Sequence, residues 1–207
     1  FWTLTILGKK LALRSGEITT GKMYGIFGGA IVGSLAYTFS DSFWFSAVEG
    51  EVYATSSLFT AAVFWAILKW EDVADEKYAD RWIILIAYLM GLSIGVHLLN
   101  LLALPAIVLV YYFRKYEFTV KGIISSIAIS FIILALLMWG IIPGLVVISS
   151  RIDLLFVNSF KLPVNSGMLF HMILLAVLFI FGIRYSLRSG NNIRTGIIAI
   201  CTLFFTG

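Results

Sequence analysis

The sequence predicts an all-α membrane protein whose helices cross the bilayer several times. Hydrophobic residues make up 60% of the 207-residue chain, and only 13% of its residues are charged. A water-soluble domain of this length could not bury so much apolar surface. Long apolar runs recur from one end of the chain to the other, which is typical of a polytopic bundle of transmembrane helices.

Six apolar runs are long enough to be complete spans, and two more look like partial ones. The complete spans are expected near residues 23–39, 53–70, 82–97, 98–113, 122–142 and 168–183, and the partial ones near 1–8 and 195–207. Because the chain begins inside one apolar run and ends inside another, we expect residues 1–207 to be a fragment of a single transmembrane domain.

Basic residues are distributed unevenly between the two sets of predicted loops. One set holds 13 of the 15 Lys and Arg residues, and the other holds only Arg151 and Lys161. Cytoplasmic loops carry such a basic excess. We therefore expect the first set to be cytoplasmic, and these loops are 9–22, 69–81, 114–121 and 184–194. The extracytoplasmic side then receives residues 39–52, the turn near 95–100 and the loop 143–167.

Two of the predicted spans are short. Residues 82–113 must enter the membrane and return within 32 residues. At about 1.5 Å per residue, each limb reaches only about 24 Å. We expect a thin or partly re-entrant hairpin, and its turn, GLSIGVHLLN, should lie within protein because irregular backbone is not tolerated against lipid.

The segment FSDSFWFSAVEGEVY at residues 39–53 carries three carboxylates and no basic residue. Acidic groups at a membrane boundary usually lie where water, a cation or a polar ligand meets the helix ends. Asp41 is equally explained as a helix cap or turn residue, and Glu49 as the partner of Ser46 in a capping box. Glu51 lacks such an explanation and is the leading candidate for a functional carboxylate, with Asp41 next.

Aromatic residues accompany these carboxylates, most notably Trp44 and Tyr53. A carboxylate beside aromatic rings is a common sugar-binding arrangement. The same rings would also serve as an ordinary interfacial aromatic belt, so both interpretations remain open.

His97 and Asn100 lie three residues apart in the predicted hairpin turn, and Ser93 precedes His97 by four residues. On a helix all three would share a face. Polar side chains within the membrane usually face protein or a polar cavity. The pair either holds the turn by hydrogen bonds or contacts a phosphate or a sugar hydroxyl.

Two further features have mainly structural explanations. Gly21, Gly25, Gly29 and Gly33 recur at four-residue intervals and predict close helix packing, and His171 is expected to pack between helices. Arg151, near Asp153, could bind a phosphate at the outer face or anchor the chain at the interface.

Several classes of chemistry find no support in the sequence. No Cys and His cluster has metal-binding spacing, so we assign no metal ligand. No phosphate-binding glycine loop is present. The basic residues follow the cytoplasmic rim and form no groove for nucleic acid.

Two motifs resemble those of a known family. The pattern W-x-x-A-V-x-x-E-V-Y is matched by Trp44, Ala47, Val48, Glu51, Val52 and Tyr53, and G-L-S-x-G-x-H by Gly91, Leu92, Ser93, Gly95 and His97. The chain resembles bacterial multi-pass membrane proteins, formerly a domain of unknown function, that are related to a eukaryotic transmembrane protein O-mannosyltransferase among the GT-C type glycosyltransferases.

The resemblance implies a GT-C-like helical bundle in the bacterial inner membrane, working with membrane lipid. Such an enzyme takes a sugar, mannose in this family, from a polyprenyl-phosphate carrier and passes it to a protein or glycan acceptor outside the cytoplasm. The family's N-terminal acidic motif and His-Pro-Pro-Gly-like stretch do not occur here, so we expect the principal catalytic base upstream of Phe1. Any C-terminal soluble domain is also expected outside the chain.

Within the chain, the resemblance makes Glu51 and Asp41 the candidate catalytic carboxylates, orienting the acceptor or a divalent cation. Substrate contacts are expected from His97, Asn100, Trp44, Tyr53, Glu49 and Arg151. No cofactor is assigned, and a divalent cation is left open. A transporter or flippase, a lipid-linked sugar polymerase or ligase, and a non-catalytic membrane subunit are the alternative functions.

Overall fold

The computed structural model describes residues 1–50, 52–189, 196 and 201, and within these residues all regular structure is helical. The chain divides into two units, the first formed by Phe1–Ala103 and the second beginning at Leu104. The all-α class predicted from composition is therefore confirmed. A single transmembrane domain over 1–207 stays a prediction.

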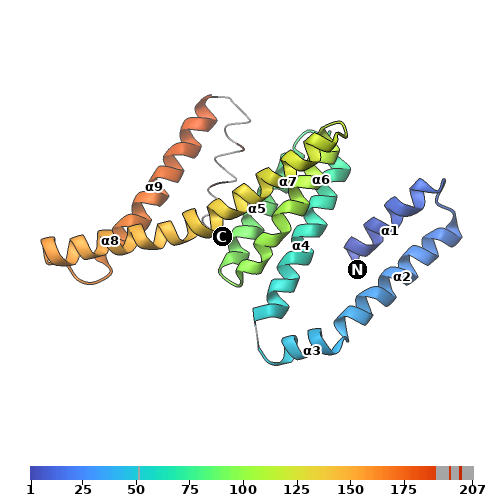
Figure 1. The fold of residues 1–207 in the computed structure, drawn as a ribbon, viewed down its shortest axis with the longest axis horizontal. Helices are drawn as coiled ribbons and strands as arrows, with labels where there is room; N and C mark the ends of the chain where they lie inside the picture. The colour runs from blue at the N-terminus through green and yellow to red at the C-terminus, as the bar shows by residue number, and fades with distance from the viewer. Residues whose placement is uncertain (51, 190–195, 197–200, 202–207) are drawn as a thin grey trace. The chain divides into compact units, whose positions relative to one another are not determined.

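The first unit contains five α-helices and a short 3-10 helix (Figure 1). They are α1 (Trp2–Arg14), α2 (Thr20–Thr38), α3 (Asp41–Val48), α4 (Val52–Val73), α5 (Asp80–Ile94) and η1 (Leu98–Ala103). Its core forms where α4 packs on α5 and η1. Val63, Ile67 and Trp70 of α4 are almost fully buried there, together with Leu101 of η1.

Turns and caps in the first unit follow from particular residues. The Thr19 hydroxyl accepts a hydrogen bond from Lys22 N at 3.3 Å and so caps the start of α2. Gly50 has a φ of 70°, a conformation that residues with a Cβ rarely adopt. This glycine turns the chain between α3 and α4.

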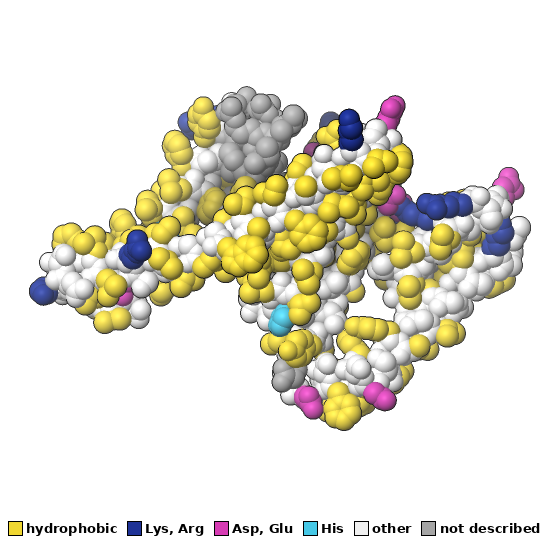
Figure 2. Space-filling model, in the orientation of Figure 1, with side chains coloured by type: hydrophobic (Ala, Val, Ile, Leu, Met, Phe, Trp, Pro, Cys, Tyr) yellow, Lys and Arg dark blue, Asp and Glu magenta, His cyan; other side chains and the backbone are white. Residues whose placement is uncertain are grey.

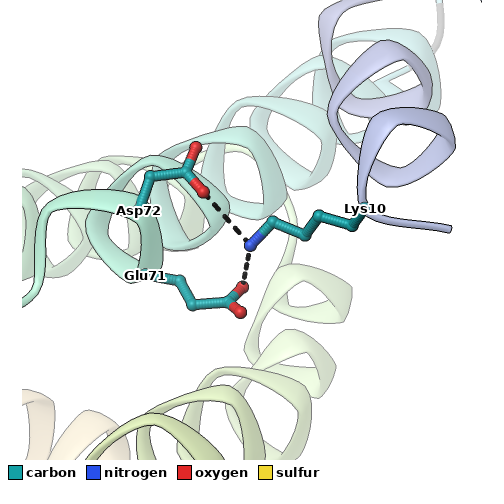
Figure 3. Close-up of polar contacts among 3 residues, drawn as sticks. All are labelled: Lys10, Glu71 and Asp72. Atoms are coloured by element: carbon teal, nitrogen blue, oxygen red, sulfur yellow. Dashed lines mark ion pairs between the residues drawn. The ribbon is translucent and has the colours of Figure 1, made fainter. Parts of the chain in front are cut away.

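An ion-pair cluster joins α1 to the end of α4 (Figure 3). Lys10 Nζ lies 2.6 Å from Glu71 Oε2 and 3.2 Å from Asp72 Oδ1. These side chains are partly exposed, so the pair contributes little stability by itself. It does bring loops 9–22 and 69–81, which the charge pattern assigns to one side of the membrane, to the same end of this unit.

The predicted glycine packing on α2 is seen only in part. A Cβ added at Gly33 would come within 3.3 Å of Leu4 Cδ1, as expected where α1 approaches closely. A Cβ added at Gly21, Gly25 or Gly29 would meet nothing within 4 Å. Most of this glycine ridge is therefore open among the described residues.

Among the described residues from Leu104 to Ser189, the second unit has four α-helices and a short π-helix. They are α6 (Leu104–Lys115), α7 (Val120–Ala135), the π-helix η2 (Leu136–Ile141), α8 (Ile142–Phe160) and α9 (Ser166–Ser189). Pairs of neighbouring helices pack along the chain, α6 on α7 and α8 on α9. Tyr112 fixes the turn between α6 and α7, because its hydroxyl lies 2.8 Å from Glu117 O and accepts from Thr119 N at 3.1 Å.

The sequence prediction of a loop at residues 143–167 is wrong for most of its length. Residues Val120–Phe160 form one helical run of 41 residues. Pro143 would clash with the carbonyl four residues earlier in a regular helix, and the wider π turn just before α8 relieves this constraint. The chain reverses only at residues 161–165, where Lys161 has a φ of 55°.

Four helical runs among the described residues are long and apolar enough to cross a membrane. They are Val52–Val73, Leu98–Lys115, Val120–Phe160 and Ser166–Tyr185, and α2 with α3, bent by 56°, would make a fifth. Helix α5 has 15 residues, about 22 Å, which is why the predicted span 82–97 falls short. Figure 2 shows hydrophobic side chains along the flanks of the helices, as expected where lipid surrounds them.

Candidate functional site

The first unit contains a pocket of about 510 Å³ bounded by α2, α4 and η1. This volume is within the range of small-molecule sites. The lining combines hydroxyl groups and aromatic rings with aliphatic side chains: Tyr37, Tyr53, Ser56, Ser57, Thr60, Ala61, Phe64, Leu99, Leu102 and Ala103.

The polar part of the lining comes mainly from one face of α4. Tyr53, Ser56, Ser57 and Thr60 recur at intervals of three and four residues, so a helix that begins at Val52 places them on the same side. Among them, Tyr53 was predicted from the sequence to be a substrate contact, and this role remains a prediction.

Asn100, a predicted substrate contact, is buried directly behind this face. It is 3% exposed. Its Oδ1 accepts from Ser56 Oγ at 3.4 Å and also bonds Thr60 Oγ1. Its Nδ2 is buried without a hydrogen-bond partner in the described chain.

The unpaired amide atom persists in either orientation of the Asn100 side chain. The Thr60 hydroxyl also reaches Ser56 O at 3.1 Å. If its single proton goes there, the amide must present its NH₂ to Thr60, which leaves the amide oxygen unpaired instead. Buried polar atoms are nearly always paired in folded proteins, so this unpaired amide atom beside the pocket-lining face of α4 is an exception.

His97 lies at the same end of the unit as Tyr53, with 5.3 Å between the ring centroids. Its Nδ1 accepts from Leu99 N at 3.1 Å, which fixes the orientation of the ring at the start of η1. The expectation that Ser93 shares a helix face with His97 and Asn100 is wrong. Helix α5 ends at Ile94, and the Ser93 hydroxyl donates to Met90 O at 2.7 Å within its own helix.

The predicted carboxylates do not line the pocket. Asp41 is exposed in the first turn of α3, and Glu49 is exposed at the end of that helix. The predicted Ser46–Glu49 capping box does not form, because Ser46 lies inside α3 and its hydroxyl donates to Ser42 O at 2.9 Å. Glu51 lies outside the described residues.

Trp44 is exposed on α3 and stacks on Phe39, with 5.9 Å between the ring centroids. It does not contribute to the pocket lining. Tyr37, which the sequence analysis did not single out, does so and also contacts Phe43, with ring centroids 4.7 Å apart.

Arg151 belongs to α8 in the second unit, where it is exposed. Its expected partner Asp153 has a different role. The Asp153 carboxylate accepts from Asn165 N at 3.1 Å and from Gly167 N at 2.9 Å. It thereby caps the start of α9, a structural use that the sequence did not reveal.

Three hydroxyl residues of the site, Ser56, Ser57 and Thr60, were missed from the sequence. Their signal was present, since A-T-S-S-L-F-T places several hydroxyls at helical spacing in an apolar span directly after Glu51. No group of three or more His, Cys, Asp or Glu side chains that could hold a metal ion occurs among the residues that the structure describes.

One family model matches the chain, that of the protein O-mannosyl-transferase TMEM260 N-terminal domain, over residues 1–121. The chain belongs to this family. The TMEM260 N-terminal match includes every residue that lines the pocket between α2, α4 and η1. No curated protein and no solved structure matches the chain.

Proposed function

We propose that this TMEM260-family chain is part of a membrane glycosyltransferase of GT-C type that moves mannose from a polyprenyl-phosphate carrier to a protein or glycan hydroxyl outside the cytoplasm. One observation carries the proposal. The residues that match an O-mannosyl-transferase domain contain a pocket lined by serine and threonine hydroxyls and two tyrosines, and the buried amide of Asn100 bonds two of these hydroxyl groups from behind.

The pocket suits one sugar unit. Hydroxyl groups of Ser56, Ser57 and Thr60 can exchange hydrogen bonds with sugar hydroxyls, because both partners donate and accept. The rings of Tyr37 and Tyr53 offer apolar faces to the C–H groups of the sugar, and such polar groups in an aromatic lining fix the orientation of a ligand.

The chemistry of transfer requires a base and a leaving group. A carboxylate deprotonates the acceptor hydroxyl, whose oxygen then attacks the anomeric carbon, while the carrier phosphate departs with the electrons of the broken bond. We propose Glu51, one residue before α4 and two before Tyr53, as the local carboxylate that orients the acceptor, with Asp41 and Glu49 at the same segment. We propose that the principal base lies upstream of residue 1. The transfer assay described below, run with and without a divalent cation, tests whether the reaction needs one.

The distribution of Lys and Arg supports a proposal for which end of the first unit faces the outside of the membrane. Loops 9–22, 69–81, 114–121 and 184–194 are proposed to be cytoplasmic. The opposite end of the first unit, with Asp41 and Tyr53, would then meet a lipid-linked donor at the outer surface of the bacterial inner membrane.

The test is mannose transfer by the full-length protein in proteoliposomes, with radiolabelled polyprenyl-phosphate mannose and a serine- and threonine-containing peptide. Thr60→Val keeps the shape of the side chain and removes its hydroxyl, and we expect it to lower transfer at least tenfold. Glu51→Gln should do the same. Ser125→Ala, which removes an exposed hydroxyl from α7, is the control and should keep the wild-type rate.

Normal transfer by both Thr60→Val and Glu51→Gln would disprove the assigned site. A wild-type protein that moved the lipid-linked sugar across the bilayer without transferring it would instead be a flippase. A protein that did neither would be a non-catalytic membrane subunit.

A further inference from the structure

We propose that a second cavity, between α8 and α9, is a lipid site that takes a neutral, hydroxyl-bearing headgroup. It belongs to the second unit and is built from residues beyond the family match. Its volume is about 450 Å³. The lining residues are Leu145, Val146, Ser149, Ser150, Asp153, Asn165, Met168, His171, Met172 and Leu175.

The feature that points to a ligand is the histidine in this cavity. His171 is 6% exposed, and its Nδ1 lies 2.6 Å from Ser149 Oγ. No described residue is hydrogen-bonded to the other ring nitrogen, Nε2. Because His171 lines the cavity, this unpaired ring nitrogen is a polar atom that a ligand there can satisfy.

A hydroxyl group is the partner that fits this nitrogen in every state of the neutral ring. If Ser149 donates to Nδ1, the proton is on Nε2 and the ligand must accept. If Nδ1 donates to Ser149, then Nε2 is an acceptor and the ligand must donate. A hydroxyl does both, whereas an ionised phosphate oxygen only accepts.

The charge of the lining favours a neutral headgroup. Asp153 contributes the one carboxylate, and the cavity has no Lys or Arg among its lining residues. Both carboxylate oxygens already accept backbone N–H groups, from Asn165 and Gly167. The remaining negative charge repels an anionic phosphate, while a hydroxyl can share these oxygens.

The depth and the walls of the cavity indicate a lipid and not a soluble polyol. His171 lies five residues into the candidate span Ser166–Tyr185, about 8 Å from its start. This is close to the boundary between headgroups and acyl chains. Leu145, Val146 and Leu175 supply aliphatic walls against which the first part of an acyl chain can pack.

The experiment is photolabelling of the full-length protein in nanodiscs with a diacylglycerol that carries a diazirine close to its headgroup, followed by peptide mass spectrometry. We expect label on Met168 and Met172, which line the cavity, to exceed label on Leu169 and Ile173 at least fivefold. All four side chains are exposed on α9, but Leu169 and Ile173 do not line the cavity. Unlabelled diacylglycerol should compete, and free glycerol should not.

Phosphatidate with the same acyl chains separates headgroup recognition from simple partitioning, and we expect it not to compete. Equal competition by phosphatidate, or uniform label along α9, would overturn the proposal. Competition by free glycerol would show a soluble polyol site and would also overturn it.

Two variants, one at His171 and one at Met172, test whether these cavity residues are needed for the labelling. His171→Leu removes both ring nitrogens and should lower the label on Met168 at least fivefold. Because His171 is buried and this change can disturb folding, Met172→Trp provides a second route that fills the cavity and leaves the Ser149–His171 hydrogen bond in place. Ile173→Trp adds the same ring at an exposed position of α9 that does not line the cavity, and is the matched control. Label on Met168 that survives Met172→Trp unchanged would contradict the proposed site.

Discussion

Asn100 is a buried side chain that links η1 to α4 in the first unit. A buried amide with one unpaired atom costs about 1–3 kcal/mol, so this residue lowers stability unless a bound group completes its hydrogen bonds. Its contacts with Ser56 and Thr60 also hold η1 against α4. The same residue therefore holds two of the pocket-lining side chains in place from behind.

Replacing Asn100 by leucine should lower mannose transfer by the full-length protein at least tenfold. The change removes the amide but keeps the side-chain size, and Ser56 and Thr60 lose their shared partner. Since the wild-type residue already has an unpaired atom, we expect the free energy of unfolding to fall by no more than about 1 kcal/mol. Asn158→Leu on α8, where the residue is exposed, should leave transfer unchanged, and a comparable loss in this control would contradict the assignment.

Gly122 is a second residue whose identity is set by its surroundings. Among the described residues, a Cβ at this position would overlap the hydroxyl of Tyr112. That hydroxyl joins the end of α6 to Thr119, whose own side chain caps α7 by accepting from Gly122 N at 3.0 Å. One added methyl group would therefore disturb both the turn and the cap.

Gly122→Ala should lower the free energy of unfolding by about 1–3 kcal/mol, because overpacking forces the tyrosine from its hydrogen bonds. Thermal unfolding in detergent measures the effect. Gly144→Ala is the matched control, since a Cβ there meets nothing within 4 Å. Equal melting temperatures for the two variants would show that the α6–α7 turn is not packed as described.

Some of the helices were predicted from the sequence, and others were not. The spans at α4 and α9 were predicted because their apolar runs have the length of a membrane crossing, and Thr19 and Thr119 form helix caps of the usual kind. The continuation of α7 into α8 was not predicted, because Pro143 and polar residues after it indicate a loop. Only the three-dimensional structure shows that a π turn accommodates this proline.

The Asp153 carboxylate on α8 fixes the contact between α8 and the start of α9. It accepts two N–H groups at the start of α9, where backbone donors have no helical partner and the helix dipole favours a negative charge. Gly167 lets the helices approach, because a Cβ there would overlap the backbone at Asp153. The 12-residue separation of Asp153 and Asn165 gave no sequence signal for this contact.

Asp153→Ala should lower the free energy of unfolding by about 1–2 kcal/mol, the usual cost of losing a helix cap. We expect the loss to appear in thermal unfolding of the full-length protein. Glu117→Ala removes an exposed carboxylate before α7 and should have little effect. An unchanged melting temperature for Asp153→Ala would show that the carboxylate does not hold the α8–α9 pair together.

For the chain as a whole, composition and charge distribution predicted the all-helical membrane class, and two short motifs predicted the family. Of the predicted substrate contacts, only Tyr53 lines the pocket, while Asn100 bonds two lining residues from behind and His97 lies against Tyr53. The hydrogen bonds from Asn100 to α4 span 40 and 44 residues, and such pairing depends on packing that periodicity cannot predict. The expected roles of His97, Asn100, Trp44, Asp41, Glu49 and Arg151 remain predictions, since these side chains are not among the residues that line the pocket.

A sugar-binding pocket in the first unit must open toward the extracytoplasmic side to meet a lipid-linked donor there. Ser57→Cys tests this most directly, because Ser57 lines the pocket and is half-buried. In full-length protein with every other cysteine replaced, including Cys201, we expect an impermeant maleimide to label position 57 only from outside the cell. Polyprenyl-phosphate mannose should slow this labelling at least fivefold, and polyprenyl phosphate without the sugar should slow it much less. Labelling only from the cytoplasm, or a rate that the sugar donor does not change, would contradict the account.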